Sequence, residues 1–194
     1  MASIREITGS IYGCYRLALK DNDALSQFNL TASGFWTSFS AMFLSLIVIL
    51  LQKSIEFKLA AADIDYVQFI FLFGLAVIIS WTCYLVAMGV LSKYLDFSAK
   101  FSTFAIVYNW SQLAIIAVWF VLAIIVTGLM GPVAAGVIGL FFIGASYLYL
   151  WHILVVTLQV TSIVAAAMAF LEFLIAILIH QALLGLLVQA PLAQ

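Results

Sequence analysis

The sequence predicts an all-α membrane protein, a polytopic transmembrane helix bundle of five spans with an N-terminal amphipathic interfacial helix. The chain has 194 residues, of which 67% are hydrophobic and 8% are charged, and its mean hydropathy is +1.26. A soluble domain usually carries roughly a quarter charged residues. Fourteen of the fifteen charged residues lie at or before Lys100, and only Glu172 lies beyond it. The second half of the chain is therefore suited to a lipid environment and not to water.

The pattern of the apolar runs favours helices over a transmembrane β-barrel. A barrel strand is a segment of about ten residues in which apolar and polar positions alternate. Residues 41–51 and 115–125 are instead almost continuously apolar. The net charge of −1 and the absence of a basic tract also exclude nucleic acid as an expected partner.

Residues 1–33 are predicted to form a cytosolic or interfacial amphipathic segment. Within residues 3–20, one side of a helix would carry Ile4, Ile7, Ile11, Cys14, Tyr15, Ala18 and Leu19, and the other side Arg5, Glu6, Arg16 and Lys20. Such a helix could lie on the membrane surface, with its basic residues near anionic headgroups. It could equally be a short cytosolic helix packed on the bundle, and the pattern leaves both interpretations open.

Residues 34–190 are predicted to form a five-helix transmembrane domain. Trp36 would anchor the first span at an interface, and Gly131-Pro132 would end the third, since proline lacks the donor that continues a helix. The connection over residues 53–66 is rich in charge and has room for a short amphipathic helix. The spans are expected at about 34–51, 67–91, 101–130, 133–158 and 163–188.

The distribution of Lys and Arg predicts the orientation of these spans. With five spans, the N-terminus and the connections after the second and fourth spans share one side and carry five Lys or Arg residues. The other side carries two. The positive-inside rule then places the N-terminus in the cytoplasm and the C-terminus outside. No cleavable signal peptide is apparent before the first span, which is expected to act as an uncleaved anchor.

Three ionisable residues of the predicted spans are candidates for a functional site. Glu172 lies in the middle of the fifth span, where a charged group costs about 3 kcal/mol on insertion scales. It is expected to be protonated at pH 7, either as a proton-titrating or ligand-binding carboxyl or as a structural hydrogen-bonding group. His180 falls on one face with Glu172, two turns away. His152 lies in the fourth span, where a contact with Glu172 is possible because the two spans are expected to be antiparallel neighbours.

Asn109 and Gln112 form a polar pair three residues apart in the third span. Both side chains can hydrogen-bond across helices, a contact worth about 0.6 kcal/mol on average in a membrane. Asn109 stands between Tyr108 and Trp110, and such aromatic residues gather at the headgroup level. The interfacial interpretation of Asn109 is the preferred one on this pattern.

Small residues of the fourth and fifth spans are predicted to mediate helix packing. They recur at spacings that let two backbones approach closely, a pattern common to polytopic proteins. The predicted packing residues are Ala135, Gly136, Gly139, Gly144, Ala165 and Ala169. Cys14 and Cys83 are expected to be ordinary small apolar residues and not a disulfide.

The sequence has no positive signal for enzyme chemistry, a cofactor or a metal. It contains no Walker loop, GxSxG, HExxH, CxxC or GxGxxG motif. The two histidines and Glu172 do not show metal-ligand spacing. No catalytic residue is therefore predicted, and the chain is expected to work without a cofactor.

The layout of the chain resembles the Yip1 family, which has a polar cytosolic N-terminal segment followed by five close-packed spans. Of that family's Asp-Leu-Tyr-Gly-Pro motif, the segment Ser10-Ile11-Tyr12-Gly13-Cys14 keeps the Tyr and the Gly. The chain is also similar to small bacterial five-span inner-membrane proteins grouped with that family, in part through Tyr108-Asn109-Trp110. In eukaryotes the resemblance implies trafficking adaptors that bind Rab GTPases, and in bacteria it implies an inner-membrane location.

Two classes of function follow as expectations. The preferred one is a non-enzymatic scaffold, membrane-shaping or complex-assembly subunit that acts through protein partners or a homo-oligomer in the bilayer. The alternative is a small transporter or substrate-binding membrane subunit that uses Glu172, His152 and Asn109, and a membrane-embedded enzyme comes third. The distinguishing observation is whether Glu172 faces a cavity or a closed helix contact.

Overall fold

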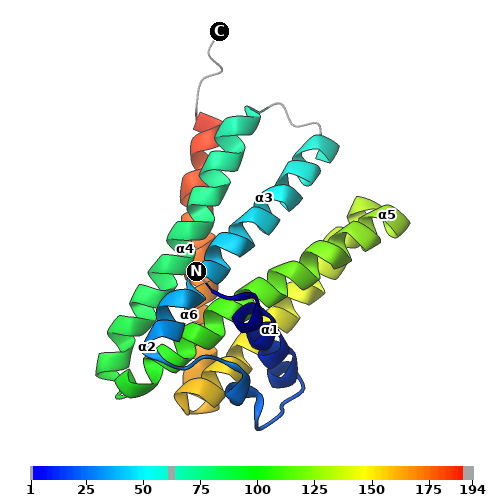
Figure 1. Cartoon of the computed structure of the whole chain (residues 1–194). Helices are drawn as coiled ribbons and strands as arrows, with labels where there is room; N and C mark the ends of the chain where they lie inside the picture. The colour runs from blue at the N-terminus through cyan, green and yellow to red at the C-terminus, as the bar shows by residue number, and fades with distance from the viewer. Residues whose placement is uncertain (1, 61–63, 190–194) are drawn as a thin grey trace.

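The computed structural model of the chain describes residues 2–60 and 64–189, and every regular element among them is a helix. Figure 1 shows that these helices form one elongated bundle, with α1 and α2 at one end and the last turns of α6 at the other. The elements are α1 (Ile4–Ala18), the short 3₁₀ helix η1 (Ala24–Gln27), α2 (Ala32–Ser38), α3 (Ser40–Ala60), α4 (Tyr66–Tyr94), α5 (Ser98–Leu158) and α6 (Ser162–Gln189).

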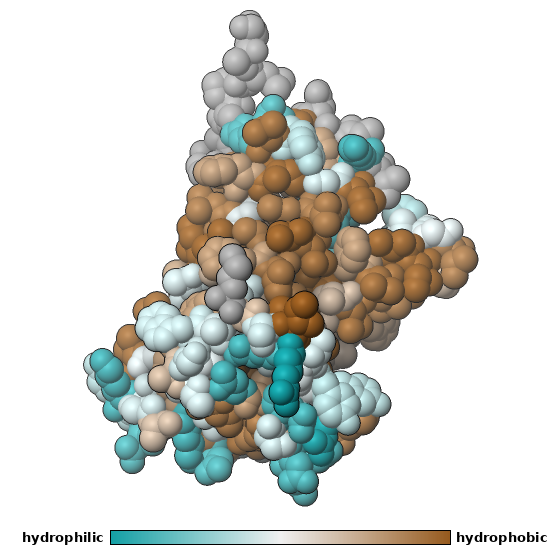
Figure 2. Space-filling model, in the orientation of Figure 1, coloured by the Kyte–Doolittle hydropathy of each residue, from teal (hydrophilic) through white to brown (hydrophobic). Residues whose placement is uncertain are grey.

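Four stretches of the described helices are long and apolar enough to cross a membrane: 32–58, 66–94, 98–158 and 162–185. The all-helical membrane class predicted from composition is thus supported by the structure. Figure 2 shows a hydrophobic band around the middle of the visible face and hydrophilic residues gathered at the end that carries α1. A bilayer demands this distribution, because the hydrocarbon region solvates apolar side chains and satisfies no backbone polar group.

The helix α5 folds back on itself at Gly131. This residue has φ +84° and ψ 171°, a conformation that interrupts the helix and that residues with a Cβ rarely adopt. The two arms then run side by side (Figure 1), with the rings of Trp119 and Phe142 5.1 Å apart between centroids. The predicted break at Gly131-Pro132 is therefore present, with the backbone of Gly131 rather than Pro132 alone making the turn.

The first part of the connection predicted over residues 53–66 continues the first long helix. Helix α3 continues to Ala60 and takes up most of the connection predicted over residues 53–66. Lys and Glu are good helix formers, and Lys53 and Glu56 pair at 2.6 Å within the helix, so these charges extend it. The next helix, α4, begins after Asp65, whose side chain accepts a hydrogen bond from the Gln68 amide at 2.6 Å.

Helices α1, η1 and α2 form a folded cap at one end of the bundle. Ser3 caps α1 by accepting from the Glu6 amide at 3.1 Å, and the Glu6 carboxylate accepts from the Thr37 hydroxyl of α2 at 2.5 Å. Gly34 allows a close approach of the chain, since a Cβ there would lie 1.8 Å from the carbonyl oxygen of Asn29. The cap is thereby tied to the start of the first long helix.

Helix α1 packs directly on α5. Cys14 and Leu17 are buried, and the Tyr149 hydroxyl of α5 donates to the Cys14 carbonyl at 2.8 Å. Of the two interpretations of this helix, packing on the bundle is therefore observed. Its outer side still exposes apolar and aromatic residues, namely Ile4, Tyr12, Tyr15 and Leu19.

The best-packed part of the bundle lies toward this capped end. Its core is a cluster of large buried side chains from α4 and α5, among them Tyr84, Phe104, Tyr108 and Trp110, joined by Leu17 of α1. Lys100 Nζ donates to Gln159 Oε1 at 2.8 Å, which joins the turns before and after α5 at the same end. Further from the cap, the α5 hairpin diverges from α3 (Figure 1), and its residues near Gly131 are largely exposed.

Candidate functional site

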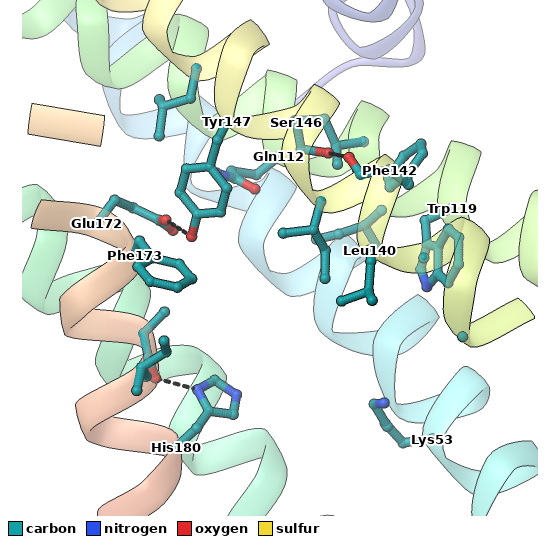
Figure 3. A pocket seen from close by; sticks show the side chains of 18 of the residues that line it. Lys53, Gln112, Trp119, Leu140, Phe142, Ser146, Tyr147, Glu172, Phe173 and His180 are labelled. Atoms are coloured by element: carbon teal, nitrogen blue, oxygen red, sulfur yellow. Dashed lines mark hydrogen bonds between the residues drawn. The ribbon is translucent and has the colours of Figure 1, made fainter. Parts of the chain in front are cut away.

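A cleft of about 630 Å³ lies between α3, the two arms of α5 and α6. Most of its wall is apolar, with residues such as Ile116, Leu140 and Ile177. Figure 3 shows that a small number of polar side chains point into it, including Glu172, Tyr147, Gln112 and His180. A concave, mainly apolar site with a few converging polar groups is typical of small-molecule binding.

Glu172 and Tyr147 meet across the inner wall of the cleft. The Tyr147 hydroxyl, on the second arm of α5, donates to Glu172 Oε2 on α6 at 2.5 Å (Figure 3). The ring of Phe173 packs edge-on against Tyr147, with 5.5 Å between centroids. Glu172 lies ten residues into α6, about 15 Å from its start at 1.5 Å per residue. A carboxyl group at that depth in an apolar helix is held by a phenol and faces a cavity.

His180 lines the same cleft two turns further along α6. Its Nδ1 lies 2.8 Å from the carbonyl oxygen of Ala176. A carbonyl oxygen only accepts, so Nδ1 carries a hydrogen, and in the neutral ring Nε2 is left as an acceptor. The ring also packs edge-on against Phe73 of α4 at 5.5 Å. The prediction that Glu172 and His180 share one helix face is confirmed, because both side chains line the cleft.

A smaller cavity of about 160 Å³ adjoins the cleft on its α4 side. The two cavities share lining residues, namely Gln112, Ile116, Glu172, Ala176 and His180. Tyr108 lines the smaller one, and its phenol is a second polar group beside the Glu172 carboxyl. Glu172 thus lines both cavities from the wall that they share.

Lys53 and Glu56 of α3 form the charged wall of the cleft. Lys53 Nζ lies 2.6 Å from Glu56 Oε2, and Gln52 Nε2 donates to Glu56 Oε1 at 2.7 Å. Lys53 Nζ also stands 5.2 Å from the centre of the Phe73 ring. The two formal charges at this wall therefore neutralise each other.

Asn109 belongs to the core and does not reach the cleft. It is fully buried, accepts from Trp81 Nε1 at 2.9 Å and donates to Ser38 Oγ at 2.9 Å. These bonds join α5 to α4 and α2 and correspond to the interhelical interpretation of Asn109, not to the preferred interfacial one. Gln112, its predicted companion, lines both cavities, so the two residues serve different parts of the bundle.

His152 is also separate from the cleft. The possible contact with Glu172 is not observed: His152 lines neither cavity, and Glu172 is bonded to Tyr147. His152 lies beside the backbone of Leu17 in α1, and its Nε2 is buried without a partner among the described residues. His152 comes five positions after Tyr147 on α5, so the two side chains lie at different heights along the bundle.

The contact between α1 and α5 encloses a thiol. Cys14 Sγ lies 3.4 Å from Ser111 Oγ, and burial raises the pKa of the Cys14 thiol from 9.0 to about 11. Cys14 and Cys83 are both free cysteines. Cys14 therefore behaves as a small buried packing residue, as its sequence context predicts.

The six predicted packing residues lie in different surroundings. Ala165 and Ala169 are buried in the bundle, and a Cβ on Gly139 would lie 3.0 Å from the Trp119 ring, so these three mediate contacts within the chain. Ala135 and Gly136 line the cleft. A Cβ added to Gly136 or to Gly144 would meet no other group within 4 Å, so nothing in the described chain packs on these two glycines.

Several residues of the cleft and of the smaller cavity are not evident from sequence patterns. Tyr147, Tyr108 and Trp119 read as ordinary aromatic residues of apolar spans. The sequence does hold a weak signal for Tyr147, since a phenol that faces a bundle needs a hydrogen-bond partner, and Glu172 is the acidic residue of the neighbouring span. Tyr147 and Glu172 meet because of the register between their two helices, and the periodicity of a sequence does not specify that register.

No family model, no curated protein and no solved structure matches this chain. Its function is therefore inferred from the site itself. The cleft offers hydrogen-bond acceptors and proton-holding groups in an apolar enclosure. Among the described residues, no group of three or more His, Cys, Asp or Glu side chains could hold a metal ion.

Proposed function

We propose that the chain is a five-span membrane protein in which the α5 hairpin supplies the third and fourth spans. Support comes from the turn at Gly131 and from the charges, since Arg5, Arg16, Lys20, Lys93 and Lys100 fall at the capped end and Lys53 and Lys58 toward the other. By the positive-inside rule the capped end is cytoplasmic, and the C-terminus lies outside. A bacterial inner membrane is the location that the Yip1-like layout suggests.

We propose that this protein binds a small molecule within the membrane, as a substrate-binding subunit or a small transporter. The observation that carries the proposal is that Glu172, besides its bond to Tyr147, lines a cleft of about 630 Å³. Intramembrane ionisable residues are costly, and they commonly mark substrate or ion pathways. The volume lies within the range of about 300–1,000 Å³ typical of ligand sites.

The scaffold function is the second candidate. It is favoured by the unpacked positions of Gly136 and Gly144 and by the exposed apolar residues of the hairpin, such as Val133 and Phe141. A helix of another protein, or of a second copy, could pack closely on these glycines. In this case the cleft would be filled by lipid and would show no selectivity.

Mass spectrometry of molecules that co-purify in mild detergent tests the two candidates. Ala176 lines both cavities, so Ala176→Phe fills the site, whereas Ala166→Phe places the same ring on an exposed face of α6. We expect a small molecule that is retained by the wild type and by Ala166→Phe and is lost from Ala176→Phe. An identical small-molecule profile in all three, with a stoichiometric protein partner, would favour the scaffold instead.

The number of spans is tested separately by single cysteines at Met130 and Thr161. Both positions are exposed, one at the hairpin turn and one at the turn before α6. In a background without Cys14 and Cys83, an impermeant maleimide should label Met130→Cys from outside and Thr161→Cys from the cytoplasmic side only. Labelling of both from one side would contradict a hairpin that crosses the bilayer.

A further inference from the structure

The polar groups in the inner part of the cleft present acceptors to a ligand. A carboxylate offers about four lone-pair positions, so the bond from Tyr147 leaves Glu172 with acceptor capacity. His180 Nε2 is an acceptor as well, because Nδ1 donates to the Ala176 carbonyl. Together these atoms favour a ligand that donates hydrogen bonds.

The carboxyl of Glu172 has no cation beside it in the described part of the chain. The lysine that lines the cleft is Lys53, and its charge is matched by Glu56 at 2.6 Å. The other Lys and Arg residues, including Lys58 of α3 and the basic residues of the capped end, are not among the residues that line the cleft. An ionised Glu172 would therefore be uncompensated until a ligand supplies a positive charge.

The walls near Glu172 are suited to a cation on an apolar body. The aromatic rings of Tyr147 and Phe173 stand beside the carboxyl, and those of Trp119 and Phe142 line the hairpin wall. Aromatic faces attract ammonium groups and also bury apolar surface. Leu140 lies between these two pairs (Figure 3), and Ile116 adds to the apolar lining of the cleft.

We propose that the ligand of this cleft is a cationic amphiphile, which places an ammonium group at Glu172 and an apolar chain or ring system along the α5 hairpin. This inference rests on the proposed binding function and specifies its ligand class. The ammonium forms a charge-assisted hydrogen bond with the carboxylate, and the carboxyl proton leaves to solvent when the ligand binds. An anionic amphiphile would instead meet a like charge, and a neutral one would gain no ion pair.

The test uses the tryptophan fluorescence of the full chain in nanodiscs of zwitterionic lipid. The probes are three brominated single-chain amphiphiles of equal length that carry a primary ammonium, a hydroxyl or a carboxylate. Trp119 lines the cleft. The same titration of the Trp119→Phe variant gives the quenching of the other tryptophans, including quenching by probe dissolved in the bilayer, and this signal is subtracted from that of the wild type. We expect saturable quenching of Trp119 by the ammonium probe at a concentration about tenfold below that of the other two.

Substitutions at two glutamates locate the selectivity. Glu172→Gln should remove the preference for the ammonium probe and leave binding of the hydroxyl probe within about twofold. Glu6→Gln makes the same chemical change in the capped end, where Glu6 contacts Thr37 and Asn29, and it should keep the preference. Trp119 quenching also reports directly on whether the Glu172→Gln variant still forms the cleft.

Each alternative outcome has a defined meaning. Equal saturable quenching by all three probes, a preference for the carboxylate, or a preference that survives Glu172→Gln would overturn the cationic ligand class and leave the cleft as a binding site. Absence of saturable Trp119 quenching with every probe would overturn both the ligand class and the proposed binding function.

Discussion

Tyr147 and Glu172 join the second arm of the α5 hairpin to α6 through a hydrogen bond of 2.5 Å between Tyr147 Oη and Glu172 Oε2. The bond lies at the wall of the cleft, and Glu172 also lines the smaller cavity, so the bond joins the two helices beside both cavities. The same carboxyl is thus both a packing contact and the polar centre of a site. The two roles can be separated by substitution.

Substitutions of Glu172 should distinguish hydrogen bonding from charge. The amide oxygen of Glu172→Gln can still accept from Tyr147, so we expect folding and assembly close to those of the wild type. Glu172→Leu leaves the phenol unpaired and should lower the free energy of unfolding by about 1 kcal/mol. Adding Tyr147→Phe to Glu172→Leu should recover part of that loss, as measured by unfolding in mixed micelles; an additive further loss would contradict the pairing.

Gly131→Ala should destabilise the hairpin. At φ +84° and ψ 171° a side chain strains the backbone, which costs about 1–3 kcal/mol, and nothing near Gly131 would clash with the new Cβ. Gly128→Ala is the matched control, since Gly128 is helical and also has open space around it, and it should be neutral or slightly stabilising. Thermal unfolding in nanodiscs measures both; equal midpoints for the two variants would show that the turn tolerates a side chain.

Asn109→Leu should weaken the core between α2, α4 and α5. It removes the bonds to Trp81 and Ser38, which at membrane values are worth about 1–2 kcal/mol together. Ser146→Ala is the control, because the Ser146 hydroxyl bonds only to the Phe142 carbonyl of its own helix. A double-mutant cycle with Trp81→Phe should give a coupling energy of about 0.6 kcal/mol, and a coupling of zero would count against the buried bond.

Cys14 should react slowly with maleimides, with an unusual pH dependence. Its pKa is raised from 9.0 to about 11 by burial, so at pH 8 the reactive thiolate is about 100-fold scarcer than for an exposed thiol. In a Cys83→Ser background, the alkylation rate should keep rising from pH 8 to pH 10. In the detergent-unfolded chain the rate should level off near pH 9, and the same levelling in the folded protein would contradict the enclosed α1–α5 contact.

The sequence predicts those features of the fold that depend on composition along the chain. The apolar length of the helices is one such feature, because a helix must be apolar over its length to cross lipid. The break at Gly131 is another, because glycine adopts backbone conformations that interrupt a helix. Helix α3 continues past the predicted end of the first span because charged residues do not by themselves end a helix. Lys53 and Glu56 instead extend it by pairing on its surface.

The candidate site is predictable only in part. Glu172 and His180 are identified by their cost in lipid and their spacing, and they do face one cleft. Their partners depend on how helices meet in space, which sequence periodicity does not encode. Sequence patterns therefore do not identify Tyr147, and they allow His152 as a partner of Glu172. They also favour the headgroup level for Asn109, because its neighbours are aromatic.

Infrared difference spectroscopy of Glu172 tests the central claim most directly. At pH 7 we expect a protonated carboxyl in the ligand-free protein, since its surroundings are apolar and no cation of the described chain pairs with it. Addition of the ammonium probe should remove a carboxylic C=O band and produce carboxylate bands, and Glu172→Gln should abolish both changes. Carboxylate bands that depend on Glu172 without any ligand, or no change on addition of the probe, would contradict the account.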